Sequence, residues 1–119
     1  MEFVEFAAFT KHLRTRITPD EYQALQNVLI ERPDFGPLIP DGGGLRKMRV
    51  RAAGRGKRGG ARVIYYWFVE DHQIHFLDIY AKNEKSDLTK AQLKELRGIL
   101  EALKELQVVR ITSQQPRRQ

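Results

Sequence analysis

The sequence predicts an α+β fold in which a curved antiparallel sheet carries two N-terminal helices on one face and a C-terminal helix follows the last strand. The expected order of elements is β-α-α-β-β-β-α. Two helix-start motifs frame the middle of the chain, and three stretches between them have the composition of strands. A length of 119 residues fits one domain with a single core.

The N-terminal part of the chain is expected to form a short strand and two helices. Residues 2–6 are rich in apolar side chains and predict the strand. Apolar residues then recur at helical spacing and predict a helix to about Arg16; they are Phe6, Phe9 and Leu13. Residues 18–21 form a capping box with proline at the first helical position, and Pro33 ends the helix that they open.

A loop containing proline and glycine over residues 34–44 leads to a predicted β-hairpin. Residues 47–51 alternate between basic and apolar side chains, so their three cations share one face: Lys47, Arg49 and Arg51. Residues 52–60 contain four glycines and form a flexible connection. Residues 61–69 are rich in β-branched and aromatic side chains, which indicates a strand buried on both faces.

Alternation also predicts a strand over residues 74–82. One face would carry Ile74, Phe76, Asp78, Tyr80 and Lys82, and the other would carry His75, Leu77, Ile79 and Ala81. By this count His75 points away from Tyr80 and Lys82.

A second capping box, at residues 89–92, opens the last helix. Its inward side chains recur at helical spacing, and they are Leu93, Leu96, Leu100 and Leu103. We expect this helix to end near Gln107. The folded domain would then span residues 1–107, and residues 108–119 would form a disordered basic tail.

The composition narrows the possible functions. The chain has no cysteine, so disulfides, thiol nucleophiles and cysteine metal sites are excluded, and we expect no cofactor and no metal. It has neither an apolar run long enough for a membrane span nor the pattern of a signal peptide, which fits a cytoplasmic protein. A net charge of +6 favours nucleic acid or an acidic protein as the partner.

Basic residues are concentrated in the predicted hairpin. Between Arg46 and Arg62 there are eight lysines and arginines and no acidic residue, out of 21 basic residues in the chain. The hairpin would bring Arg62 close to Arg49 and Arg51, on a sheet face left partly open. A solvated strand face is the simpler explanation of scattered charges, but acids are absent within this segment, which favours a phosphate-binding surface.

Other motifs in the sequence are weaker evidence for a function. Gly54, Gly56 and Gly59 match the letters of a dinucleotide-binding loop, but they lie between two strands instead of opening a helix. The three histidines, His12, His72 and His75, show no spacing typical of a metal site or an acid–base pair. Tyr66 and Tyr80 could stack on bases, although a core position is the simpler prediction for Tyr66.

Three ordered segments, LRKMRVR, GRGKRGGARVIYY and IYAKNEKSDLT followed by a leucine-striped helix, resemble the RelE/HigB-type toxins of bacterial toxin–antitoxin pairs. The resemblance covers roughly residues 3–106 and is strongest to the HigB-like branch of the RelE superfamily. It implies a RelE-like fold and a metal-independent mRNA interferase that cleaves mRNA in the ribosomal A site. It also implies a cognate antitoxin with a HigA-like helix-turn-helix.

The resemblance also implies roles for individual residues. The catalytic positions of the family fall on Lys47, Arg49 and Arg62, and we add Lys82 because Asn83 and Thr89 depart from the family pattern. The expected RNA-binding residues are Arg51, Lys57, Arg58, Tyr80 and Asn83. Lys47 and Lys82 are the candidates for proton transfer. The alternatives are a non-catalytic nucleic-acid-binding module, a ribosome-independent ribonuclease and an inactive toxin relative that only binds its antitoxin.

Overall fold

The computed structural model describes residues 1–51, 60–82 and 87–114, with side chains described as far as residue 106. The predicted order of elements is confirmed. The elements are β1 (Glu2–Glu5), α1 (Ala7–Arg16), α2 (Pro19–Glu31), β2 (Arg46–Val50), β3 (Ala61–Phe68), β4 (Gln73–Ala81) and α3 (Lys90–Gln114).

The four strands form one sheet in the order β1-β4-β3-β2. The prediction of antiparallel pairing is correct for β2 with β3 and for β3 with β4. It is wrong for β1, which runs parallel to β4 and makes the sheet mixed. The alternation of side chains shows which residues share a face of a strand, but it contains no information about the direction of the neighbouring strand.

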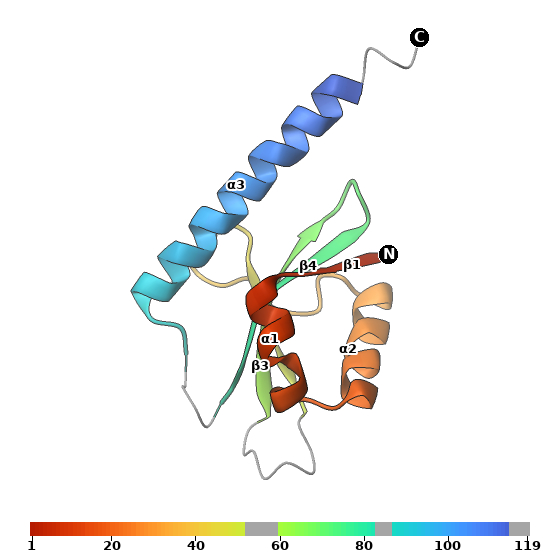
Figure 1. The fold of residues 1–119 in the computed structure, drawn as a ribbon, viewed down its shortest axis with the longest axis vertical. Coiled ribbons are helices and arrows are strands. Elements are labelled where there is room, and N and C mark those ends of the chain that lie inside the picture. The colour runs from red at the N-terminus through yellow and green to blue at the C-terminus, as the bar shows by residue number, and fades with distance from the viewer. Residues whose placement is uncertain (52–59, 83–86, 115–119) are drawn as a thin grey trace.

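The helices α1 and α2 cover one face of the sheet, as predicted (Figure 1). Their buried side chains pack against residues from β2, β3 and β4; they are Phe9, Leu25 and Leu29, and Ile17 between the two helices joins them. The helix α3 packs on the opposite face, where Leu100 lies against Leu45, Ile64, Leu77 and Tyr80. The C-terminal end of α3 extends away from the sheet (Figure 1). Within the described residues, no helix is long and apolar enough to span a membrane.

Both predicted capping boxes are present. The Thr18 hydroxyl accepts the Glu21 N–H at 3.1 Å, and the Glu21 carboxylate accepts the Thr18 N–H at 2.7 Å. At α3 the Thr89 hydroxyl accepts the Gln92 N–H at 3.1 Å, while the Gln92 side chain accepts the Thr89 N–H at 2.9 Å. Each cap satisfies backbone donors that the first helical turn leaves unpaired, and a single cap contributes about 1 kcal/mol.

The helix α3 is longer than predicted, because it continues past Gln107 to Gln114. No glycine or proline occurs between these positions, and the first residue that cannot continue a helix is Pro116. The part of the predicted tail that lies at residues 108–114 is therefore helical, and residues 115–119 lie outside the described part of the chain.

A β-bulge in β4 changes the predicted faces of that strand. The register passes from Ile64↔Asp78 to Tyr65↔Phe76 and so skips Leu77. One extra residue reverses the alternation of side chains on one side of the bulge. As a result Phe76 packs with Ile79 under α1 and α2, while Leu77 and Tyr80 pack on the α3 side.

The bulge also makes the prediction for His75 wrong. The His75 ring has edge contacts with Phe6 and Phe68, at centroid distances of 6.2 and 4.6 Å. Phe6 belongs to the α3-side cluster, so His75 lies on the same face as Tyr80, toward the opposite end of β4. Burial lowers the pKa of His75, which is typical of a structural imidazole in a core.

The loop before β2 is fixed by one buried tyrosine. The Tyr65 hydroxyl donates to the Pro33 carbonyl and accepts the Gly36 N–H, both at 2.9 Å. Next to it, the Lys47 N–H donates to the Pro37 carbonyl at 3.1 Å. These bonds hold the loop against the start of β2, and they give that strand a defined position at the sheet edge.

Candidate functional site

Three chemically active side chains occupy neighbouring positions across the strands. Arg49 of β2 lies opposite Arg62 of β3, and Arg62 lies opposite Tyr80 of β4. Residues opposite one another in paired strands project to the same face, which here is the face that carries α3. The prediction that Arg62 lies beside Arg49 is therefore confirmed.

The two arginines differ in their environment. Arg49 is exposed to solvent, whereas Arg62 is only 6% exposed. One nitrogen of the Arg62 guanidinium donates to the Ala61 carbonyl at 3.4 Å, within its own strand. A buried, permanently charged guanidinium in the middle of a sheet keeps its position before any anion arrives.

Tyr80 belongs to the core in this structure. It is 3% exposed and packs with Leu45, Ile64, Leu77 and Leu100. Burial, followed by the negative charge of Asp87, raises the pKa of Tyr80 to about 12, and the charge of Arg62 opposes this rise. The phenol therefore keeps its proton at neutral pH, and its buried ring has no free face for stacking on a base.

Lys47 lies on the same strand as Arg49 and forms an ion pair that the sequence analysis missed. Its ammonium nitrogen is 3.0 Å from Oδ1 of Asp87, which belongs to the segment before α3. The same oxygen accepts the Leu88 N–H at 2.8 Å. The Lys47 ammonium first, then this N–H, hold the pKa of Asp87 below its usual range, and the charge of Arg62 adds to the effect.

The charge pattern of residues 46–62 contains no acid and therefore does not predict this ion pair. Asp87 lies 40 residues after Lys47. A signal was present in the sequence, since Asp87 lies two residues before Thr89, which opens the last helix. That helix follows the strand next to Arg62, so an acid at its start can reach the cations.

Two further predicted site residues, Lys82 and Arg51, lie at the same end of the sheet. Lys82 is exposed, and its N–H donates to the Gly60 carbonyl at 3.0 Å, just beyond Ala81. Arg51 is exposed and directly follows β2. We call the set Lys47, Arg49, Arg51, Arg62 and Lys82 the cationic end. The predicted contacts Lys57, Arg58 and Asn83 lie outside the described residues.

Gly60 brings the strands together at the cationic end. Its φ angle of +68° is one that residues with a side chain rarely adopt. A Cβ atom at this position would lie 2.2 Å from the Val50 carbonyl oxygen and 3.4 Å from the Cα of Arg51. The close approach of β2 and β3 at this end therefore depends on a residue without a side chain.

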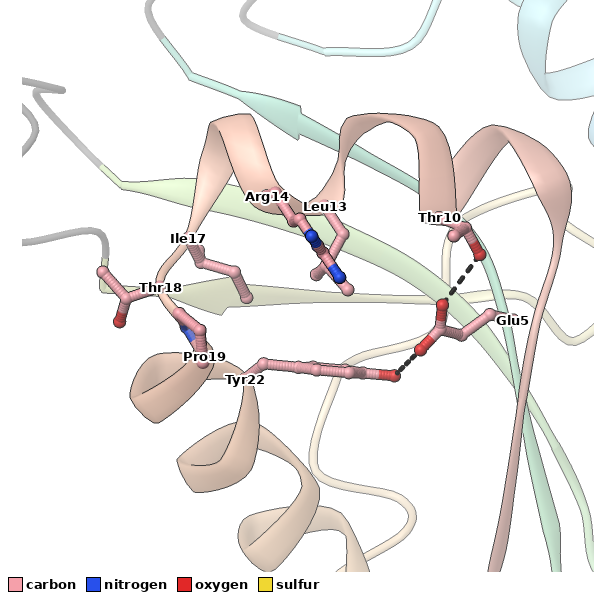
Figure 2. Close-up of a pocket in the computed structure, with 8 residues that line it drawn as sticks. All are labelled: Glu5, Thr10, Leu13, Arg14, Ile17, Thr18, Pro19 and Tyr22. Carbon is pink, nitrogen blue, oxygen red and sulfur yellow. Dashed lines mark hydrogen bonds between the residues drawn. The ribbon is translucent and has the colours of Figure 1, made fainter.

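A separate pocket of about 560 Å³ lies between α1 and α2 (Figure 2). On its wall the Glu5 carboxylate accepts hydrogen bonds from the hydroxyls of Thr10 and Tyr22, both at 2.7 Å. Burial, and next the Glu5 carboxylate, raise the pKa of Tyr22 above its usual range. This pocket is on the face of the sheet that α1 and α2 cover, opposite to the face that carries Arg49 and Arg62, and its hydrogen bonds connect β1, α1 and α2.

A family model described as the RelE toxin of the RelE / RelB toxin–antitoxin system matches residues 38–116. The matched segment contains β2, β3, β4 and all of α3, and therefore the whole cationic end and Asp87. It covers 79 of the 119 residues. The fold has the three helices and the open mixed sheet expected of such a toxin. The chain therefore belongs to the RelE toxin family of toxin–antitoxin systems.

Proposed function

We propose that this toxin is a ribosome-dependent mRNA interferase of the HigB-like branch, which cuts mRNA in the ribosomal A site and so inhibits translation. Membership of the RelE toxin family supports a role in a toxin–antitoxin pair. The observation that carries the proposal is the position of Arg62, which is buried between Arg49 and Tyr80 on two neighbouring strands. Arg62 provides a fixed positive charge next to the exposed charge of Arg49.

The chemistry of RNA cleavage fits such a site. RNA contains its own nucleophile, the 2′-hydroxyl, which attacks the adjacent phosphorus and leaves a 2′,3′-cyclic phosphate. The transition state gains negative charge on the phosphate oxygens, and preorganised cations stabilise it because they need no rearrangement. We assign this role to Arg49 and Arg62, whose planar guanidinium groups suit phosphate oxygens.

The other cations of the site have different tasks. The exposed Lys82 ammonium is assigned to donate a proton to the departing 5′-oxygen. Arg51 and the predicted contacts Lys57, Arg58 and Asn83 are assigned to the RNA backbone. Lys47 is the cation of an ion pair with Asp87, so we assign it the role of a charge and not that of a base.

The partners follow from the same proposal. A toxin that acts on translating ribosomes works in the cytoplasm, and it needs a cognate antitoxin, for which we propose a HigA-like protein with a helix-turn-helix. Its gene would lie next to the toxin gene. We assign no surface of this chain to the antitoxin.

The test is cleavage of mRNA on programmed ribosomes by the purified toxin, with the RNA ends mapped. Arg62→Ala should lower the cleavage rate by about 10²–10³, the typical loss when one stabilising donor is removed. Arg14→Ala is the matched control, because Arg14 is exposed on α1 on the other side of the sheet. Full activity of Arg62→Ala would remove Arg62 from the mechanism, and abolition of cleavage by EDTA would indicate a metal-dependent reaction instead.

One observation favours a second candidate, an inactive relative that only binds its antitoxin. Thr89 lies near the position where the family resemblance implies a base-stacking tyrosine, and in this structure its hydroxyl caps α3. Such a protein would bind its antitoxin, yet leave ribosome-bound mRNA intact. The same ribosome assay separates the two, because only the interferase produces new RNA ends.

A further inference from the structure

We infer that Asp87 is the group that accepts the 2′-hydroxyl proton in the reaction proposed above, on which this inference rests. The structure brings this carboxylate to the cationic end from a distant part of the sequence. Its Oδ1 is 3.0 Å from the Lys47 ammonium nitrogen, and its negative charge acts on both Arg62 and Tyr80.

The position of Asp87 is defined by two different contacts. The Lys47 ammonium holds the carboxylate from β2, and the Leu88 N–H holds it from the start of α3 at 2.8 Å. The side chain is 64% exposed, so a substrate can reach it. A proton acceptor has to be both oriented and accessible, and this carboxylate meets both requirements.

The neighbouring groups cannot take this proton. Arginine does not lose its proton in proteins, which excludes Arg49 and Arg62. Lys47 is already an ammonium in its ion pair with Asp87, and Tyr80 keeps its phenolic proton because its pKa is raised to about 12.

Two other titratable groups of β4 are less suitable. His75 is near the start of β4 and packs against Phe6 and Phe68. Asp78 is partly buried and lines a groove under α3 with Phe6. Asp87 combines an exposed side chain with a contact to Lys47 of the cationic end, which supports its assignment as the base.

Substrate binding would strengthen this base. In the free protein the Lys47 ammonium and the Leu88 N–H favour the ionised carboxylate, so Asp87 carries no proton at neutral pH. An incoming phosphate competes for Lys47 and adds negative charge nearby. Both effects raise the pKa of a carboxylate and therefore its affinity for a proton.

The 2′-hydroxyl proton moves to the Asp87 carboxylate while an electron pair of the 2′-oxygen forms the new bond to phosphorus. The bond from phosphorus to the 5′-oxygen breaks, and its electron pair leaves with that oxygen, which takes a proton from Lys82. Asp87 and Lys82 then regain their starting forms by exchange of protons with water.

The experiment compares cleavage and binding for Asp87→Asn on programmed ribosomes, at saturating enzyme and in a single turnover. We expect the cleavage rate to fall by about 10²–10⁴, as is typical when a general base is removed. Binding to the ribosome should stay equal or become tighter, because one negative charge leaves a cationic surface. Asp71→Asn is the matched control: it makes the same change of charge in the turn between β3 and β4, at the other end of the sheet.

The variant Lys47→Ala tests whether Asp87 is itself the base or only holds Lys47 in position. If Asp87 acts only through Lys47, removal of the lysine must reduce cleavage at least as much as Asp87→Asn does. We expect Asp87→Asn to lower the cleavage rate more than Lys47→Ala does. The inference is overturned if Lys47→Ala loses as much, if Asp87→Asn cleaves normally, or if it loses binding together with cleavage. Failure of the wild-type toxin to cleave would instead overturn the proposed function.

Discussion

Arg49 and Arg62 lie directly opposite each other on the antiparallel strands β2 and β3. Like charges at opposite positions of a strand pair destabilise a sheet. The protein keeps this arrangement in the part of the sheet that the proposed function assigns to phosphate. A site prepared for an anion has this property, because a bound anion lowers the repulsion between the two arginines.

Replacing Arg49 by glutamine should therefore stabilise the fold while it weakens the activity. We expect the free energy of unfolding to rise by about 0.2–1 kcal/mol, the range of a cross-strand pair, and the cleavage rate to fall. Urea unfolding and the ribosome assay measure the two quantities. A loss of stability in Arg49→Gln would show that the arginine pair is neutralised within the free protein.

Arg62→Lys tests whether shape matters in addition to charge. Lysine keeps the positive charge but loses the planar guanidinium that can bind two oxygens at once. We expect its cleavage rate to lie between those of the wild type and Arg62→Ala, and growth arrest on expression to weaken in the same order. Equal rates for Arg62→Lys and the wild type would mean that charge alone is needed at this position.

Gly60→Ala should destabilise the sheet at the cationic end. The new Cβ would meet the Val50 carbonyl oxygen at 2.2 Å, on a backbone with φ of +68°. The free energy of unfolding should fall by more than about 1 kcal/mol, since such a position is incompatible with a side chain.

Gly98→Ala is the matched control for this substitution. Gly98 lies within α3, and a Cβ atom there would have no neighbour within 4 Å. Alanine is the better helix former by about 0.5–1 kcal/mol, so this variant should be more stable than the wild type. A Gly60→Ala variant as stable as the wild type would contradict the role assigned to Gly60.

The stability of the protein should fall at alkaline pH. Burial raises the pKa of four tyrosines, which are Tyr22, Tyr65, Tyr66 and Tyr80. The unfolded chain loses these protons near pH 10, before the folded protein does. The contribution of these tyrosines to the free energy of unfolding is therefore complete below about pH 10. It decreases as the pH rises toward the pKa in the folded protein, which is about 12 for Tyr80.

Urea unfolding measured between neutral pH and about pH 11 tests this dependence. Tyr80→Phe has no phenol at this position, so its free energy of unfolding should decrease less steeply with pH than that of the wild type. If the free energy of unfolding changed with pH equally in the two proteins, Tyr80 would not contribute to this dependence.

The sequence was most informative where one local pattern determines one structural feature. The threonines at positions 18 and 89 each precede a glutamate or glutamine by three residues, and both capping boxes are present in the structure. The alternation around Met48 identified the buried and basic faces of β2 because an edge strand with one core face has a strict period of two.

The features that were missed depend on contacts between distant segments. The direction of β1 is set by its pairing with β4, 71 residues further along the chain at Gln73. The bulge at Leu77 does not require a particular type of residue, so the sequence of β4 does not reveal it. Asp87 reaches Lys47 only because α3 starts beside β2 and β3 in the folded protein. Roles assigned to the individual cations by resemblance stay predictions until the variants are measured.

The bulge at Leu77 has a consequence for how this chain can change in length. Because of this one additional residue, β4 supplies Phe76 to one hydrophobic layer and Tyr80 to the other. Deletion of Leu77 alone would leave Phe76 opposite Tyr65 and Asp78 opposite Ile64, so every side chain beyond it would keep its layer. The strand is therefore expected to tolerate the loss of one residue at Leu77, with the loss of one apolar side chain from the α3-side layer.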